Sequence, residues 1–162
     1  MTTSPDLRFL LRHPAHLLAM GFGSGLASKA PGTFGSLAAI PLFLLFPAWP
    51  LAWMLALLAL LFLLGVWCCG VTGRALGVSD HGGIVWDEMV AMWLILALVP
   101  RTLFWFAAAF ALFRLFDIWK PFPIRQFDAR LKGGFGVMFD DLLAAGYALA
   151  GLKALQWLMT HS

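Results

Sequence analysis

The chain has 162 residues, of which 62% are hydrophobic and only 12% are charged, and its mean hydropathy is +0.88. Soluble domains carry about 25% charged residues, so this composition excludes an ordinary soluble domain and indicates an integral membrane protein. The net charge of +3 comes without a basic run interleaved with aromatic residues, which sets nucleic acid aside as a partner.

The length allows one domain, residues 1–162. Its first part, 1–16, is a short basic stretch that we expect to form a peripheral N-terminal segment. A cleavable signal peptide is not evident. We therefore expect the apolar segments themselves to direct membrane insertion.

Five apolar segments predict the helices of the domain. Between Lys29 and Arg74 there are 44 consecutive uncharged residues, enough for two passes, because about 20 residues span a bilayer. The prolines in 47–50 divide this run into helices at about 33–46 and 51–70. Further helices are expected at about 84–99, 103–119 and 137–159, with a polar loop at 122–136. The sequence predicts an all-α integral membrane bundle of about five to six helices, some of them half-spanning.

Basic residues are distributed unevenly over the ends of these helices. If each helix crosses the membrane, the ends alternate between its two sides, and only Arg101 and Lys153 fall on the second side. The positive-inside rule makes the first side cytoplasmic. That side collects nine of the eleven basic residues: Arg8, Arg12, Lys29, Arg74, Arg114, Lys120, Arg125, Arg130 and Lys132.

Five of the eight carboxylates border the apolar helices on this same side: Asp87, Glu88, Asp117, Asp140 and Asp141. A carboxylate near lipid is costly, about 2.5–3.5 kcal/mol at the bilayer centre, and carboxylate oxygens are the ligands that Mg²⁺ prefers. We expect the five to surround one or two Mg²⁺ ions in an enzyme that acts on a phosphate. The simpler alternative is that the acidic pairs cap or begin helices, where the helix dipole favours them, and that Asp117 belongs to a salt-bridge stripe that lets a helix end reach water.

Cations and glycine-rich loops lie beside these acids. The loop 23–36 contains Lys29 and ends with Thr33 and Ser36, where a helix begins and can bind an anion. Arg114 and Lys120 flank Asp117 at helical spacing. The candidates for binding substrate phosphate are therefore Lys29, Thr33, Ser36, Arg114, Lys120 and Arg125. The alternatives are a flexible capped loop for the first three and a salt-bridge stripe for Arg114 and Lys120.

A cysteine phosphatase is a further alternative, because Cys68 and Arg74 fit the spacing C-x₅-R. In such enzymes a thiolate attacks and a loop of N–H groups binds phosphate. That loop follows a strand, whereas an apolar helix is expected before Cys68, so we do not favour this alternative.

Several segments together resemble the phosphatidylglycerophosphatase A family of bacterial lipid phosphatases. They are GFGSGL at 21–26, PGTFGS at 31–36, VWDE at 85–88, FRLFDIWKPFPI at 113–124 and GGFGVMFDD at 133–141. The resemblance implies an all-helical fold of about six helices. It also implies Mg²⁺-dependent hydrolysis of phosphatidylglycerophosphate to phosphatidylglycerol and phosphate in the bacterial inner membrane. Under this hypothesis the five acids are catalytic and bind metal at the cytoplasmic face, and the lipid tails lie along the first and third helices.

Other functions are weighed against this one. The enzyme could act on another lipid phosphate monoester, such as phosphatidic acid. A non-enzymatic membrane transporter would place ionisable groups near mid-membrane and show inverted repeats, and neither is visible; a scaffold would need none of the acids. The oligomeric state, the identity of the base and the choice between water attack and an aspartyl-phosphate intermediate stay open.

Overall fold

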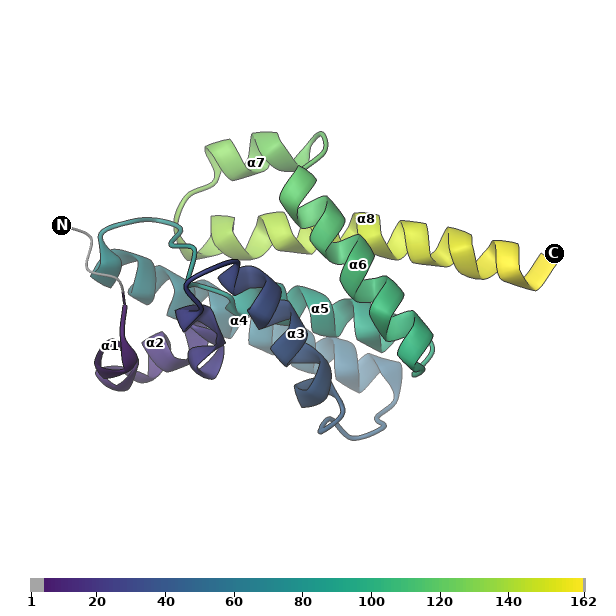
Figure 1. Cartoon of the computed structure of the whole chain (residues 1–162), viewed down its shortest axis with the longest axis horizontal. Coiled ribbons are helices and arrows are strands. Elements are labelled where there is room, and N and C mark those ends of the chain that lie inside the picture. The colour runs from purple at the N-terminus through teal and green to yellow at the C-terminus, as the bar shows by residue number, and fades with distance from the viewer. Residues whose placement is uncertain (1–4, 162) are drawn as a thin grey trace.

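The computed structural model describes residues 5–161, and this part of the chain is all-helical, with no β-strand. The all-α prediction is therefore confirmed. Residues 1–4 of the predicted N-terminal segment, and residue 162, lie outside the described residues. The elements, in chain order (Figure 1), are α1 Leu7–Leu11, α2 Pro14–Ala19, the 3₁₀-helix η1 Gly21–Leu26, α3 Pro31–Phe43, α4 Leu51–Leu76, α5 Trp86–Leu98, α6 Leu103–Trp119, α7 Ile124–Arg130 and α8 Gly133–His161.

The five long helices correspond to the five predicted ones, with differences at their ends. Helix α6 has the predicted bounds, because the Thr102 side chain accepts the Trp105 N–H at its start and Pro121 follows its end. Helix α4 runs to Leu76 instead of residue 70, and ends where Gly77 adopts a left-handed φ of 74°. Helix α8 begins at Gly133 instead of 137, and α7 occupies the predicted loop. With the short helices α1, α2 and α7, the described part of the chain has more helices than the five to six predicted.

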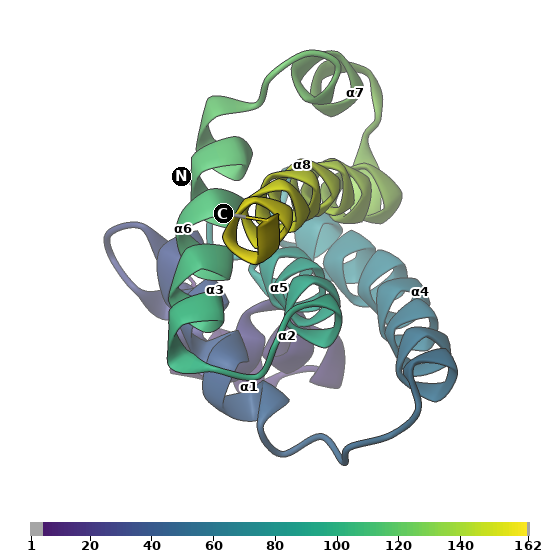
Figure 2. The same ribbon diagram turned by 90° about the vertical axis from the view of Figure 1, so that its right-hand side faces the viewer.

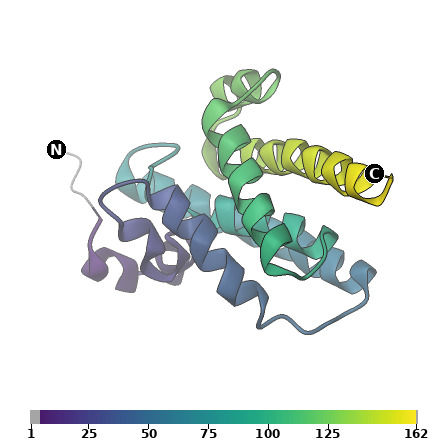
Figure 3. The same cartoon turned by 45° about the vertical axis from the view of Figure 1, so that its right-hand side comes forward.

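Helix α8 is the hub of the bundle and packs against α4, α5 and α6. Viewed end-on, it lies between α6 and α4, with α5 beneath it (Figure 2). Helix α6 crosses the bundle steeply instead of lying parallel to the other helices (Figure 3). Helix α3 covers α5, and α2 covers α4.

Helix α5 is the most buried long element, and two tryptophans fix its place. The Trp86 indole N–H donates to the Leu61 carbonyl of α4 at 3.1 Å, and that of Trp93 donates to the Ala39 carbonyl of α3 at 2.8 Å. Because a buried indole N–H needs a partner, these bonds set the depth of α5 relative to both neighbours. They hold the first turn of α5, where Asp87 lies, at a defined level.

The N-terminal helices are docked onto the bundle. The ring of His16 in α2 hydrogen-bonds to Thr72 of α4 through Nδ1 and Oγ1, 3.0 Å apart. The N–H of Val85, just before α5, donates to the Ala19 carbonyl at 2.8 Å. These contacts join α2 to the end of α4 and the start of α5. Whether the segment 1–16 lies at a membrane periphery stays a prediction.

Two helices, α4 and α8, are long and apolar enough to cross a membrane, by length and composition. Their 26 and 29 residues correspond to about 39 Å and 43 Å at about 1.5 Å per residue. Helix α5, with 13 residues, reaches only about 20 Å, less than the roughly 30 Å of a hydrocarbon core. Because core helices of soluble proteins also meet these criteria, membrane crossing stays a prediction.

The close packing of α8 on α4 depends on a glycine. A Cβ at Gly134 would collide with the Val66 carbonyl oxygen and lie 2.8 Å from the Gly70 nitrogen. A Cβ at Gly146, on the same helix, would meet nothing within 4 Å. Substituting alanine at the two positions therefore distinguishes the loss of close helix packing, at Gly134, from the loss of glycine in a helix, at Gly146.

We expect Gly134→Ala to destabilise the protein by about 1–3 kcal/mol, because α8 must move away from α4. Gly146→Ala should be neutral or stabilise by up to about 1 kcal/mol, because alanine favours helix. Thermal unfolding in detergent, followed by circular dichroism, measures both. A Gly134→Ala protein that melts at or above the wild-type temperature would contradict this packing.

Candidate active site

Helix ends from distant parts of the sequence meet at one end of the bundle. Asp87 and Glu88 lie in the first turn of α5, Arg114 and Asp117 in the last turns of α6, and Asp141 in the first half of α8. The start of α3 lies against the same group. The chain thus gathers polar side chains from apolar helices at the places where those helices begin or end.

The acidic cluster, defined as Asp87, Glu88 and Asp141, is the centre of this region. Each residue offers one carboxylate oxygen, and the three oxygens lie within 4.8 Å of one another. Asp87 and Asp141 are only 7% and 3% exposed. Asp87 Oδ1, Glu88 Oε2 and Asp141 Oδ2 are buried without a hydrogen-bond partner among the described residues. Buried carboxylate oxygens without partners are costly, and this arrangement fits a divalent cation with oxygen ligands.

The electrostatics of α5 agree with that interpretation. Burial raises the pKa of Asp87 well above its usual value, and the nearby charges of Glu88 and Asp141 raise it further. Burial also raises the pKa of Glu88, to about 7. Both acids therefore resist ionisation in the folded protein, and a bound cation would favour their charged forms.

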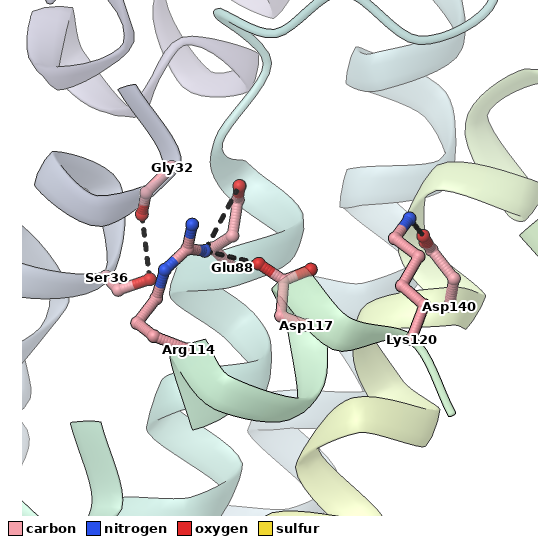
Figure 4. A network of polar contacts seen from close by, with 7 residues as sticks. All are labelled: Gly32, Ser36, Glu88, Arg114, Asp117, Lys120 and Asp140. Atoms are coloured by element: carbon pink, nitrogen blue, oxygen red, sulfur yellow. Dashed lines mark hydrogen bonds and ion pairs between the residues drawn. The ribbon is translucent and has the colours of Figure 1, made fainter. Parts of the chain in front are cut away.

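Arg114 links the acidic cluster to Asp117 (Figure 4). Its Nη1 lies 3.9 Å from Glu88 Oε1 and forms an ion pair with Asp117 Oδ2. Its Nε is buried without a partner among the described residues, which leaves a donor for an anionic ligand. Gly32, in the first turn of α3, packs so closely that a Cβ would collide with Glu88 Oε1 and lie 3.2 Å from Arg114 Nη1.

Lys120 and Asp140 form a separate ion pair beside the acidic cluster. The Lys120 Nζ lies 2.6 Å from Asp140 Oδ2 and 3.3 Å from Asp128 Oδ1. Burial lowers the pKa of Lys120. The hydrogen bond to Asp140 and the charges of the surrounding carboxylates raise it by more, so the net pKa is above its usual value. The structure therefore does not bring Asp140 into the acidic cluster, although Asp141 is the next residue, because consecutive helical side chains point about 100° apart.

The remaining residues predicted to bind phosphate differ in their exposure and in whether they lie near the acidic cluster. Lys29 is exposed just before α3, and Thr33 is half-buried in its first turn. The buried Ser36 hydroxyl donates to the Gly32 carbonyl at 2.8 Å and so supports the start of α3. Arg125 is exposed on α7. The structure brings the start of α3 to the acidic cluster and gives Arg125 no polar contact with it among the described residues.

A cavity of about 370 Å³ adjoins this region, between the loop that precedes α3 and the loop that precedes α5. Its lining includes Ser28, Pro31 and His81. The His81 Nδ1 accepts the Gly83 N–H at 3.0 Å, which shapes the second loop. Pro31 of this lining directly precedes Gly32, the residue of α3 that packs against Glu88.

Two observations modify the sequence-based interpretation. Asp128, which binds Lys120, was not among the candidates, because it lies in a segment predicted as a polar loop and no motif marks it. Cys68, the candidate thiol nucleophile, is buried within α4, and its Sγ lies 3.6 Å from the Gly65 carbonyl as a donor. A regular helix there excludes the phosphate-binding loop that a cysteine phosphatase needs.

Comparison with known proteins is consistent with this geometry. The family model described as Phosphatidylglycerophosphatase A matches residues 17–156. A Haemophilus influenzae protein named Phosphatidylglycerophosphatase A is 51% identical over 158 residues, covering 96% of this chain and 97% of the relative. The Escherichia coli protein of the same name is 47% identical over 148 residues, covering 90% and 84%.

A third relative carries a different name. It is a Bacteroides thetaiotaomicron protein provisionally described as a phosphatidylinositol-3-phosphatase, 41% identical over 151 residues, covering 88% of this chain and 94% of the relative. No solved structure matches the chain.

The raised pKa values predict how stability depends on pH when no divalent cation is bound. The folded-state pKa values of Asp87 and Glu88 lie above their usual values near 4, so the folded state binds protons more tightly than the unfolded state. Their stabilising contribution is present below about pH 4 and is lost as the pH rises through their folded-state pKa values, which for Glu88 is about 7. We expect the melting temperature in EDTA to fall between about pH 5 and pH 8.

Asp87→Asn should raise the melting temperature in EDTA at pH 8, because it removes a buried like charge. Asp6→Asn is the control, because Asp6 caps α1 at the surface and asparagine caps equally well; it should keep the wild-type pH profile. Thermal unfolding across pH measures all three proteins. A wild-type melting temperature independent of pH, or a lower one in Asp87→Asn, would contradict the account.

Proposed function

Because the chain belongs to the phosphatidylglycerophosphatase A family and is a phosphoric monoester hydrolase, we propose that it hydrolyses phosphatidylglycerophosphate to phosphatidylglycerol and phosphate. The reaction is Mg²⁺-dependent and takes place at the cytoplasmic face of a bacterial inner membrane. The observation that carries the proposal is the acidic cluster, with its unpartnered oxygens beside the Arg114 guanidinium.

Asp87, Glu88 and Asp141 are the residues that would hold the metal. Mg²⁺ is usually held by one or two carboxylates together with waters and substrate phosphate oxygens, and the three unpartnered oxygens of the cluster supply that donor set. When bound, Mg²⁺ neutralises phosphate charge and makes a bound water more acidic. Asp117 adds a fourth carboxylate, close enough to Asp141 for the two charges to interact.

Arg114 is the residue best placed to bind the phosphate. Glu88 and Asp117 orient its guanidinium, and its buried Nε has an unused N–H to donate to a non-bridging oxygen. A guanidinium that is already oriented before the reaction stabilises the charge that develops during phosphoryl transfer. Lys29 and the backbone N–H groups at the start of α3, which packs against Glu88 and Arg114 at Gly32, would add further donors to the phosphate.

Hydrolysis breaks the bond between phosphorus and the glycerol oxygen, and a water oxygen takes its place on phosphorus. A carboxylate of the site that is not fully engaged with the metal accepts the proton of that water. The released glycerol oxygen takes up a proton to complete phosphatidylglycerol. Lys120 is committed to Asp140 and Asp128, so its part is to hold the α6–α7 corner against α8 and to add positive charge nearby.

The membrane location is supported by the distribution of charges and apolar side chains. Trp53, Leu60 and Leu63 of α4 are 69%, 65% and 63% exposed, which is unusual for a soluble surface. The two basic residues assigned to the far side lie at the other end of the bundle: Arg101 stacks on Phe43, 5.0 Å from the ring centroid, and Lys153 donates to the Leu98 carbonyl. The acidic cluster lies at the end that carries Arg114 and Lys120, and the sequence assigns most of the basic residues to this side, which supports a cytoplasmic position by the positive-inside rule.

Phosphate release from a panel of lipids tests this function. The purified protein in detergent should release phosphate faster from phosphatidylglycerophosphate than from phosphatidic acid or phosphatidylinositol 3-phosphate. Removal of Mg²⁺ with EDTA should lower the rate at least about a hundredfold, because a metal ion contributes several kcal/mol of charge stabilisation, and added Mg²⁺ should restore it. Undiminished turnover in EDTA would contradict the metal, and a preference for either other lipid would contradict the substrate.

Arg114→Lys tests the phosphate-binding role. Lysine keeps the charge but loses the planar fork and the Nε donor, so kcat should fall about 10²–10³-fold with the fold retained. Arg130→Lys, on the exposed end of α7, is the matched control and should keep wild-type turnover. If Arg114→Lys is as active as Arg130→Lys, the phosphate contact lies elsewhere.

A further inference from the structure

An apolar groove lies between α4, α5 and α8 and encloses about 360 Å³. Side chains from all three helices line it, among them Leu58 and Phe62 of α4, Leu94 of α5 and Leu142 of α8. Its volume is within the range of ligand sites, about 300–1,000 Å³. Leu63 at its edge is 63% exposed, so the groove opens sideways along α4.

The groove and the acidic cluster share helix α5. Val90 and Leu94, which line the groove, lie three and seven residues after Asp87. Because residues at these spacings share one helix face, the groove continues along the face of α5 that carries Asp87. Leu94 lies about 10 Å further along the helix, at about 1.5 Å per residue.

Helix α4 runs antiparallel to α5 and forms the opposite wall. The hydrogen bond from Trp86 to the Leu61 carbonyl sets Phe62 near the level of the acidic cluster. Leu58 therefore lies further from the cluster, toward Leu94. The Phe62 and Val90 end of the groove is therefore the one nearer the acidic cluster, and the Leu58 and Leu94 end lies further from it.

We propose that this groove holds one acyl chain of the phospholipid whose phosphate lies at the acidic cluster. The proposal rests on the proposed function. A polar ligand would lose its hydrogen bonds among these walls, whereas a hydrocarbon chain gains roughly fourfold in affinity for each methylene buried. An occupant that carries an anionic phosphate at one end and a hydrocarbon chain at the other matches both the acidic cluster with its cation and the apolar groove on the same face of α5.

The sequence predicts that the acyl chains lie along α3 and α5. The groove instead places a chain between α4, α5 and α8. Helix α3 packs directly on α5, where Trp93 donates to the Ala39 carbonyl at 2.8 Å. The space that a chain can enter therefore lies on the other side of α5. The groove thereby gives the enzyme a means of selecting a membrane lipid over a soluble phosphate monoester.

Ala59→Trp tests the acyl site. Ala59 lines the groove and is exposed, so a larger side chain fills the groove without entering the core. With phosphatidylglycerophosphate of long acyl chains, kcat/KM should fall at least about tenfold, the equivalent of two or more methylenes. With six-carbon chains, which fill little of the groove, it should stay within about twofold of wild type.

Ala56→Trp is the matched control, because Ala56 is an exposed alanine of the same helix that does not line the groove. It should leave kcat/KM unchanged for both lipids. Equal long-chain activity in the two variants would overturn the proposal. A wild-type protein that hydrolyses neither lipid would instead refute the proposed function.

Photo-crosslinking tests whether an acyl chain occupies the groove, independently of turnover. Phosphatidylglycerophosphate carrying a diazirine in one acyl chain should label Leu58, Ala59 and Leu94 of the wild-type protein, and excess unlabelled substrate should prevent it. Labels spread evenly over exposed positions such as Leu60 would indicate bulk lipid only and would overturn the proposal. The groove would instead be a contact between two copies of the protein if it carried no label and if Ala59→Trp eluted as a smaller oligomer on size-exclusion chromatography. That result would also overturn the proposal.

Discussion

The burial of three carboxylates within one small space is the constraint on which the rest of the structure depends. Asp87, Glu88 and Asp141 place oxygens within 4.8 Å of one another, and Arg114 lies 3.9 Å from Glu88. A single guanidinium shared with Asp117 does not balance this charge, and three oxygens keep no partner among the described residues. A fold that maintains such a cluster bears a cost in stability, which the proposed divalent cation would offset.

The apolar helices provide the rigidity that keeps these charges together. The indoles of Trp86 and Trp93 fix α5 against α4 and α3, and Gly134 lets α8 approach the backbone of α4. Lys120 then joins the end of α6 to α8 through Asp140. Because the acids of the site stand on three packed helices, α5, α6 and α8, small shifts in packing move them relative to one another. Helices α5 and α8 also line the groove, together with α4, so the contacts that position the acids position the proposed acyl site as well.

Much of this arrangement could be predicted from the sequence, and the failures have physical causes. Prolines and caps mark helix ends, so α6 had the predicted bounds. Helix α7 was missed because seven polar and apolar residues between prolines and glycines carry no clear period, and α8 was started late because glycine-rich sequence indicates a loop. Spacing identified Asp140 and Asp141 as a pair. It could not show that one turns to Lys120 and the other to the acidic cluster, because that depends on the packing of α6 against α8.

Metal binding by the acidic cluster is the central claim, and titration with Mn²⁺ followed by electron paramagnetic resonance tests it most directly. Mn²⁺ has the same preference for carboxylate oxygens as Mg²⁺ and gives a signal of its own when free. The account predicts saturable binding to the wild-type protein, competition by Mg²⁺, and binding at least about tenfold weaker in Asp141→Asn, because a ligand charge is lost. Wild-type affinity in Asp141→Asn, with the fold intact, would contradict it.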